Sequence, residues 1–74
     1  MSEIMMEKFK KVCPNHRLQH MYMVDVEDAV LIAFREVGYT PSKTLKKAID
    51  RVWANSNRED YLWEFVFNVW REDS

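Results

Sequence analysis

Three residues near the start of the chain have the types and spacing of metal ligands. Cys13, His16 and His20 follow the pattern C-x-x-H-x-x-x-H, and a thiolate with two imidazoles can bind zinc. A structural zinc site needs a fourth ligand, which here would be a distant carboxylate such as Asp25. Pro14 also interrupts the helix that would align the first two ligands. We therefore predict a packed cysteine and two surface histidines, with no metal and no cofactor.

Catalysis has little support in the sequence. The chain contains one glycine, which excludes a glycine-rich phosphate loop. Cys13 and scattered hydroxyl groups are the candidate nucleophiles, but no base is identifiable beside any of them. A domain of 74 residues also offers a small cleft at best. We predict that the protein is not an enzyme and has no catalytic residues.

Residues 29–53 have the outline of a helix-turn-helix DNA-binding motif. A helix, a short turn containing Gly38 and a basic helix follow one another. The second helix of such a motif enters the major groove, where its polar face contacts bases and phosphates. In this chain residues 41–54 would supply those contacts. The candidate DNA-binding residues are Ser42, Lys43, Thr44, Lys46, Lys47 and Arg51.

The fit to that motif is imperfect. Phe34 stands where a small residue is usual, and Thr44 and Lys47 stand at positions that are normally apolar. We therefore interpret the stretch as an ordinary helical hairpin. A DNA-binding transcriptional regulator remains the alternative function.

Aromatic residues are concentrated in the last stretch of the chain, 56–74. On a helix of about 100° per residue its polar residues form one narrow stripe, and apolar residues occupy the remaining arc. That arc is wider than contact with a small core requires, so we expect its edges to bind another protein or a second copy of the chain. One edge is Tyr61 with Phe65, and the other is Trp63 with Phe67. The predicted protein-binding residues are Trp63, Phe67, Trp70, Tyr61 and Phe65.

The elements that position these residues are predicted to be helices at residues 2–13, 25–37, 40–54 and 56–74. Each begins at a residue able to cap it: Ser2, Asp25, Thr40 and Ser56. Ser56 and Glu59 have the spacing of a capping box, Pro41 suits a first helical position, and Gly38 suits a helix end.

The second predicted helix has an apolar face built from Val26, Ala29, Val30, Ala33 and Val37, with Leu31, Ile32 and Phe34 on its flanks. Residues 14–24 are predicted to form a helical turn or an ordered loop, because a lone strand would have no pairing partner. The predicted fold is an all-α bundle of three to four short helices, one domain over residues 1–74, with the C-terminal aromatic helix at its centre.

Charge is unevenly distributed along the chain, although the net charge is −1. Four acidic residues against one basic residue give −3 over residues 21–40, and four basic against one acidic give +3 over residues 41–56. The single cysteine has no disulfide partner, which is typical of a reducing compartment. We expect a cytoplasmic protein (in the host cytoplasm if it is viral) that does not enter a membrane.

The most consistent interpretation is a small protein-binding regulator or inhibitor. Its size, its lack of catalytic motifs and its surplus of aromatic residues all favour binding over chemistry. We expect a phage or bacterial source and a protein partner or a homo-oligomer, with DNA as the less favoured partner.

Overall fold

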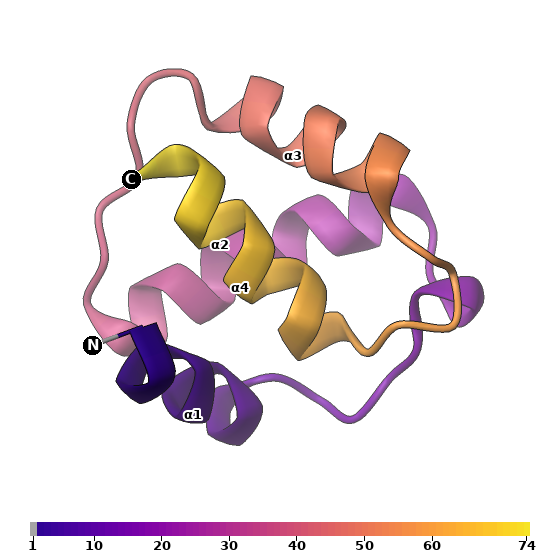
Figure 1. Ribbon diagram of the computed structural model, residues 1–74, viewed down its shortest axis with the longest axis horizontal. Helices are drawn as coiled ribbons and strands as arrows, with labels where there is room; N and C mark the ends of the chain where they lie inside the picture. The colour runs from indigo at the N-terminus through magenta and orange to yellow at the C-terminus, as the bar shows by residue number, and fades with distance from the viewer. Residues whose placement is uncertain (1) are drawn as a thin grey trace.

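Four α-helices and one 3₁₀ turn make up the part of the chain that the computed structural model describes, residues 2–74 (Figure 1). They are α1 (Ser2–Val12), η1 (Leu18–His20), α2 (Met23–Val37), α3 (Leu45–Asn55) and α4 (Leu62–Asp73). The predicted all-α class is therefore confirmed. The helical turn η1 also agrees with the prediction for residues 14–24.

The C-terminal helix α4 is central, as predicted. It contacts α1, α2 and α3, whereas α1 makes its other main helix contact with α2. Figure 1 shows α4 crossing in front of α2, with α3 on one side of it and α1 on the other. The buried residues of α4 are Leu62, Phe65, Val66 and Val69. Because α4 has neighbours on three sides, a wide apolar arc is what this position in the fold requires.

The core is one cluster to which every α-helix and η1 contribute. The buried residues are Phe9, Leu18, Val26, Val30, Ala33, Phe34, Ala48, Ile49, Leu62, Phe65, Val66 and Val69. Aromatic rings join the helices, since the Phe34 ring centre lies 5.9 Å from that of Phe9 and 5.0 Å from that of Tyr39. Phe34, expected at the flank of the buried stripe, is therefore fully part of the core.

The predicted start of α3 at Thr40 and Pro41 is wrong, because the helix begins at Leu45. The backbone N–H of Ser42 donates to the Asp73 carboxylate at the end of α4, over 2.8 Å. Ser42 Oγ then accepts a hydrogen bond from the Thr44 backbone N–H. These bonds hold residues 42–44 in a turn, so the connection after α2 is longer than that of a helix-turn-helix.

The predicted start of α4 at Ser56 is also wrong. Ser56 Oγ donates to the Val52 carbonyl at the end of α3, over 2.6 Å, so this residue does not cap α4. Helix α4 starts after Tyr61, whose backbone N–H donates to the Glu64 carboxylate. That bond is one half of a capping box, placed five residues later than the sequence suggested.

The segment before α4 pairs with the segment around η1 through backbone hydrogen bonds. Leu18 N–H donates to the Asp60 carbonyl over 2.9 Å, and Leu62 N–H donates to the His16 carbonyl over 2.8 Å. Arg17 and Tyr61 form an isolated antiparallel bridge between the two segments. Backbone groups that a longer helix would have satisfied internally are satisfied here by a distant part of the chain.

The remaining boundaries differ from prediction by a few residues. Helix α2 begins at Met23, so Asp25 lies in its first turn and is not its cap. Gly38 closes α2 in the left-handed conformation, with φ of 78°, as predicted. The predicted capping role of the Ser2 side chain lies outside what the structure describes.

Candidate functional site

The predicted protein-binding aromatics of α4 do not share one environment. Phe65 is buried, with 1% of its surface exposed, and its ring packs edge-on against Trp53 of α3 at 5.8 Å. The prediction that Phe65 lies at an exposed edge is therefore wrong. Tyr61, Trp63, Phe67 and Trp70 are half-buried, and the last three of them pack against the core.

Cationic side chains lie over three of the half-buried aromatic rings. Lys10 Nζ lies 4.7 Å from the ring centre of Trp63, and the Arg17 guanidinium lies 4.5 Å from that of Tyr61. Arg71 lies over Phe67 at 5.7 Å. Each cation is attracted to the electron-rich face of its ring. A partner that bound the Trp63–Phe67 edge would have to displace these cations first.

Most of the exposed large apolar side chains lie on a different element, α2, or next to it. Val24, Leu31 and Ile32 are 60%, 48% and 59% exposed, and Tyr22 just before the helix is 78% exposed. The chain's other large exposed apolar residue among those described is Ile4 of α1. In α2 the inward positions are already occupied by Val26, Val30, Ala33 and Phe34. The outward aliphatic side chains are thus additional to those that hold the helix in place.

Sequence reasoning missed this surface. The spacing i, i+4, i+7 and i+11 places Val24, Asp28, Leu31 and Arg35 in one row, and Ile32 borders that row. The sequence pattern indicates this surface, because apolar residues occupy the inner face of α2 and also part of its outer face. It was overlooked because Leu31 and Ile32 can be read as flanks of the buried stripe.

Charged residues line the outward face of α2. Asp25, Asp28, Arg35 and Glu36 are all exposed, and none of them forms an ion pair with another residue of the range 2–74. Glu27 is different, because its carboxylate is 2.6 Å from Lys46 Nζ on α3. The outward face therefore combines aliphatic side chains with acidic groups that nothing in the described chain neutralises.

A shallow hollow lies at the C-terminal end of this face. It measures about 390 Å³ and is lined by Leu31, Phe34, Arg35, Gly38, Tyr39, Thr40 and Pro41. The hydroxyl of Tyr39 points away to donate to the Asp73 carboxylate over 2.8 Å. Burial, followed by that hydrogen bond and by the Asp73 charge, raises the pKa of Tyr39 to about 12. Tyr39 is thus neutral at physiological pH.

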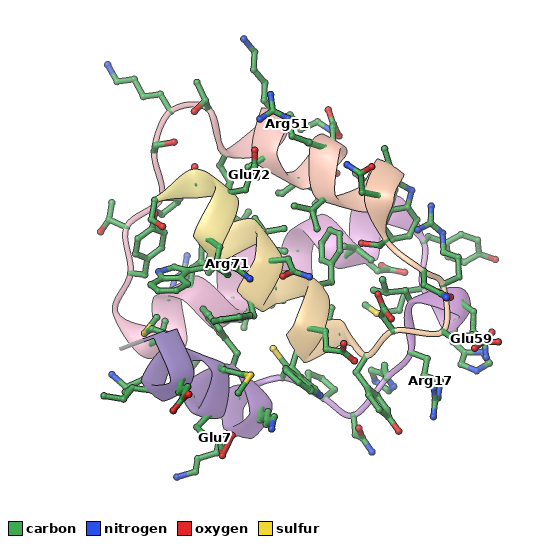
Figure 2. The ribbon with its side chains drawn as sticks, in the orientation of Figure 1. Glu7, Arg17, Arg51, Glu59, Arg71 and Glu72 are labelled. Atoms are coloured by element: carbon green, nitrogen blue, oxygen red, sulfur yellow. The ribbon has the colours of Figure 1, made fainter. Side chains whose placement is uncertain are left out.

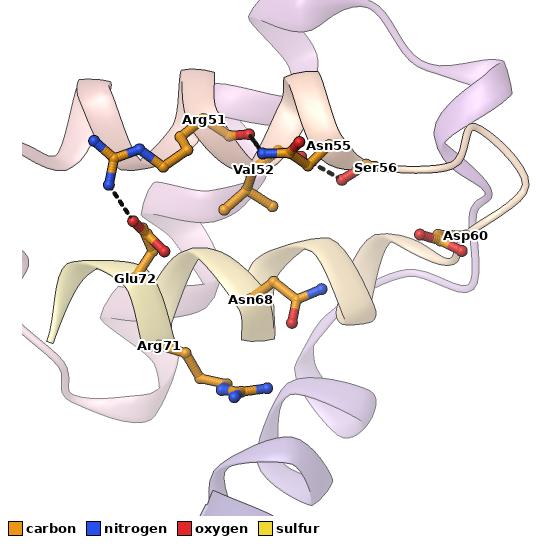
Figure 3. A pocket seen from close by; sticks show the side chains of 8 residues that line it. All are labelled: Arg51, Val52, Asn55, Ser56, Asp60, Asn68, Arg71 and Glu72. Atoms are coloured by element: carbon orange, nitrogen blue, oxygen red, sulfur yellow. Dashed lines mark hydrogen bonds and ion pairs between the residues drawn. The ribbon is translucent and has the colours of Figure 1, made fainter.

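A second hollow, about 370 Å³, lies between α3 and α4 (Figure 3). Its polar groups mostly satisfy one another: Arg51 pairs with Glu72 across the two helices, and the Asn55 amide donates to the Arg51 carbonyl over 2.9 Å. Figure 2 shows Arg51 and Glu72 pointing toward one another, with Arg71 on the near side of α4. This arrangement joins two helices and offers no paired nucleophile and base for catalysis.

Most of the candidate DNA-binding residues bond to other groups of the chain. Lys46 contacts two carboxylates, Glu27 at 2.6 Å and Asp50 at 3.1 Å, and its pKa is raised by these hydrogen bonds. Arg51 pairs with Glu72, and Ser42 Oγ donates to Asp73 over 2.5 Å and contacts the Thr44 hydroxyl. Lys43 and Lys47 form no ion pair within residues 2–74. Two such lysines are a small footprint for DNA, which proteins bind through many phosphate contacts.

We expect the protein to leave random duplex DNA unshifted in a gel at low salt, because carboxylates pair with Lys46 and Arg51 and leave only two lysines among the candidate residues unpaired within residues 2–74. The measurement is a mobility-shift titration of wild type at two salt concentrations. A shift that fell steeply with salt, and that disappeared in Lys43→Glu/Lys47→Glu, would establish the DNA alternative instead. Both lysines are exposed, so this variant leaves the core intact.

The structure does not gather Cys13, His16 and His20 into a metal site. Among residues 2–74, no three His, Cys, Asp or Glu side chains converge as ligands would. Cys13 is half-buried beside the core, and burial raises the pKa of its thiol to about 11. It is therefore an unreactive thiol at neutral pH.

Within residues 2–74, no helix combines the length and the apolar character that crossing a membrane demands. No protein family, no curated protein and no solved structure matches this chain in the comparisons made with each. The candidate site therefore depends on the geometry of the chain alone.

Proposed function

We propose that this protein is a small regulator or inhibitor that works by binding another protein through the outward face of α2. The observation that carries the proposal is the exposure of Val24, Leu31 and Ile32 on one face of one helix. The anchors of a helix that lies in an apolar groove have this spacing. A binder of this kind inhibits by covering a surface that its partner needs.

The core supports this assignment by accounting for the other apolar residues of α2. Val26, Val30 and Phe34 are buried against the rest of the bundle, so α2 is already anchored without its outward aliphatic side chains. Leaving such side chains in water gives the folded chain no stability, whereas burying them against a partner is favourable. The half-buried Trp63, Phe67, Trp70 and Tyr61 remain the alternative docking surface, and a cytoplasmic location remains part of the proposal.

The test is a selection of displayed random peptides on the immobilised protein, followed by affinity measurements with three forms of the chain. We expect Leu31→Asp/Ile32→Asp to weaken the selected peptides about tenfold or more, because each change places a carboxylate in an apolar contact. Phe67→Ser, on the alternative surface, is expected to change affinity little. Both forms should keep the helical circular dichroism spectrum of wild type.

If Phe67→Ser weakens the selected peptides and Leu31→Asp/Ile32→Asp does not, the binding surface lies on α4, as the sequence suggested. Peptides that bind all three forms equally would exclude both surfaces. Sedimentation of the same forms tests a second copy as the occupant: self-association that Leu31→Asp/Ile32→Asp abolishes would identify the chain itself as the partner.

A further inference from the structure

The charged residues in the central row of the outward face of α2 change sign along the helix: Asp28 lies in its N-terminal half and Arg35, its one basic residue there, in its last turn. Asp25 flanks this row at the N-terminal end. Glu36 follows Arg35 but lies about 100° further round the helix, and it does not line the hollow beside Leu31. All four charged residues are exposed. Leu31 and Ile32 lie between the acidic and the basic end. Because a helix rises about 1.5 Å per residue, the carboxylates and the guanidinium are roughly 10–15 Å apart along the axis.

Arg35 lies at the edge of the hollow beside Leu31. The hollow has Phe34 and Tyr39 among its lining residues, and the Tyr39 hydroxyl is occupied by Asp73. Arg35 forms no ion pair and no side-chain hydrogen bond within residues 2–74. Its guanidinium is therefore a free cation next to an apolar depression, which suits an apolar side chain with a carboxylate close by.

We propose that the partner segment is itself dipolar: a basic residue faces Asp25 and Asp28, a large apolar side chain enters the hollow beside Leu31, and an acidic residue pairs with Arg35. This inference rests on the proposed function and adds the chemistry and the direction of the bound segment. Opposite charges across an interface set the register and exclude partners of the reverse order. A segment with its charges reversed would place like charges together at both ends.

Arg35 also has a structural role that the test must separate from recognition. A cation in the last turn stabilises a helix by interacting with the helix dipole, whether or not a partner is bound. Loss of affinity in an Arg35 variant is therefore insufficient by itself. Rescue by a charge change in the peptide is informative, because a structural role would not respond to the charge of the ligand.

The probe is the displayed peptide library, with the selected sequences read for charge order. We expect peptides selected on wild type to carry a basic and an acidic residue on either side of a large apolar one. Arg35→Glu should weaken them about tenfold, and changing their acidic residue to lysine should restore binding to Arg35→Glu while weakening binding to wild type. Lys47→Glu makes the same charge change on α3 and should have no effect.

The experiment distinguishes failure of this inference from failure of the proposed function. Peptides that require Leu31 and Ile32 but ignore Arg35→Glu, or that carry no charge order, would overturn this inference and leave the proposed function standing. Peptides that do not require Leu31 and Ile32 would overturn both. If Arg35→Glu lowers the thermal midpoint, Arg35→Gln is used instead, because it removes the cation without adding a carboxylate. Peptides that bind Arg35→Gln as tightly as wild type would also overturn the inference.

Discussion

Replacing Phe65 with alanine is expected to destabilise the protein by about 3–5 kcal/mol, the usual loss when a buried phenylalanine is truncated. Phe65 is 1% exposed and packs against Trp53, so the change leaves a cavity between α4 and α3. At about 0.05–0.15 kcal/mol per residue, a chain of 74 residues has only a few kcal/mol to lose. Urea unfolding at 25 °C, followed by circular dichroism, measures the difference.

Phe67 provides the matched control, because it lies two residues further along the same helix and is half-buried. Its ring stacks on Trp70 at 5.8 Å and lies under Arg71, so Phe67→Ala should cost clearly less than Phe65→Ala. Equal losses, or a larger loss at Phe67, would show that α4 is rotated from the orientation described. If Phe65→Ala is unfolded without urea, Phe65→Leu keeps most of the volume and gives a measurable, smaller loss.

Changing Asp73 to asparagine is expected to destabilise the protein by about 1–2 kcal/mol at neutral pH, with part of the usual hydrogen-bond energy lost to solvent exposure. The Asp73 carboxylate accepts from Tyr39 Oη, from the Ser42 backbone N–H and from Ser42 Oγ, over 2.8, 2.8 and 2.5 Å. These bonds fasten the end of α4 to the connection between α2 and α3. The variant should therefore loosen the start of α3 as well.

The pH dependence of that loss follows from the pKa of Asp73. Burial acts to raise this pKa, but the hydrogen bonds from Ser42 and Tyr39 outweigh it, and the pKa is lowered from its ordinary value of 3.8. A carboxyl group with a lowered pKa stabilises the fold above its ordinary pKa, and this contribution is lost as the pH falls through the lowered value. Wild type and Asp73→Asn should therefore differ most at neutral pH, well above the ordinary pKa of 3.8, and should converge as the pH falls through the lowered pKa of Asp73.

Ser42→Ala is the control for this prediction. It removes the Oγ bond but keeps the backbone N–H bond to Asp73, so it should reproduce only part of the loss and part of the pH dependence. A difference between wild type and Asp73→Asn that stayed constant from pH 7 to acid would mean that the charge of Asp73 contributes nothing. Guanidinium unfolding at a series of pH values measures all three forms.

The helical class and most of the core could be predicted from sequence because they depend on local chemistry. Apolar residues at helical spacing place Val26, Val30 and Ala33 inside, and Gly38 ends α2 because it alone adopts φ of 78° without strain. The central position of α4 followed from the width of its apolar arc, which needs neighbours on several sides. Each of these properties is carried by residues a few positions apart.

Only the tertiary structure decided where α3 and α4 begin and which surface remains exposed. Thr40 and Ser56 are good capping residues by type. Near Thr40, however, the Asp73 carboxylate accepts a hydrogen bond from the backbone N–H of Ser42. Ser56 donates to the Val52 carbonyl, and the segment that follows it pairs with residues 16–19. Exposure was decided in the same way. Phe65 packs against Trp53 of α3, and Lys10 of α1 lies over the Trp63 ring. Leu31 and Ile32 of α2, by contrast, meet no neighbour that buries them. The types of Thr40 and Ser56 make them able to cap a helix. They do not determine whether a residue distant in the sequence, such as Asp73, binds the same segment and keeps it out of the helix.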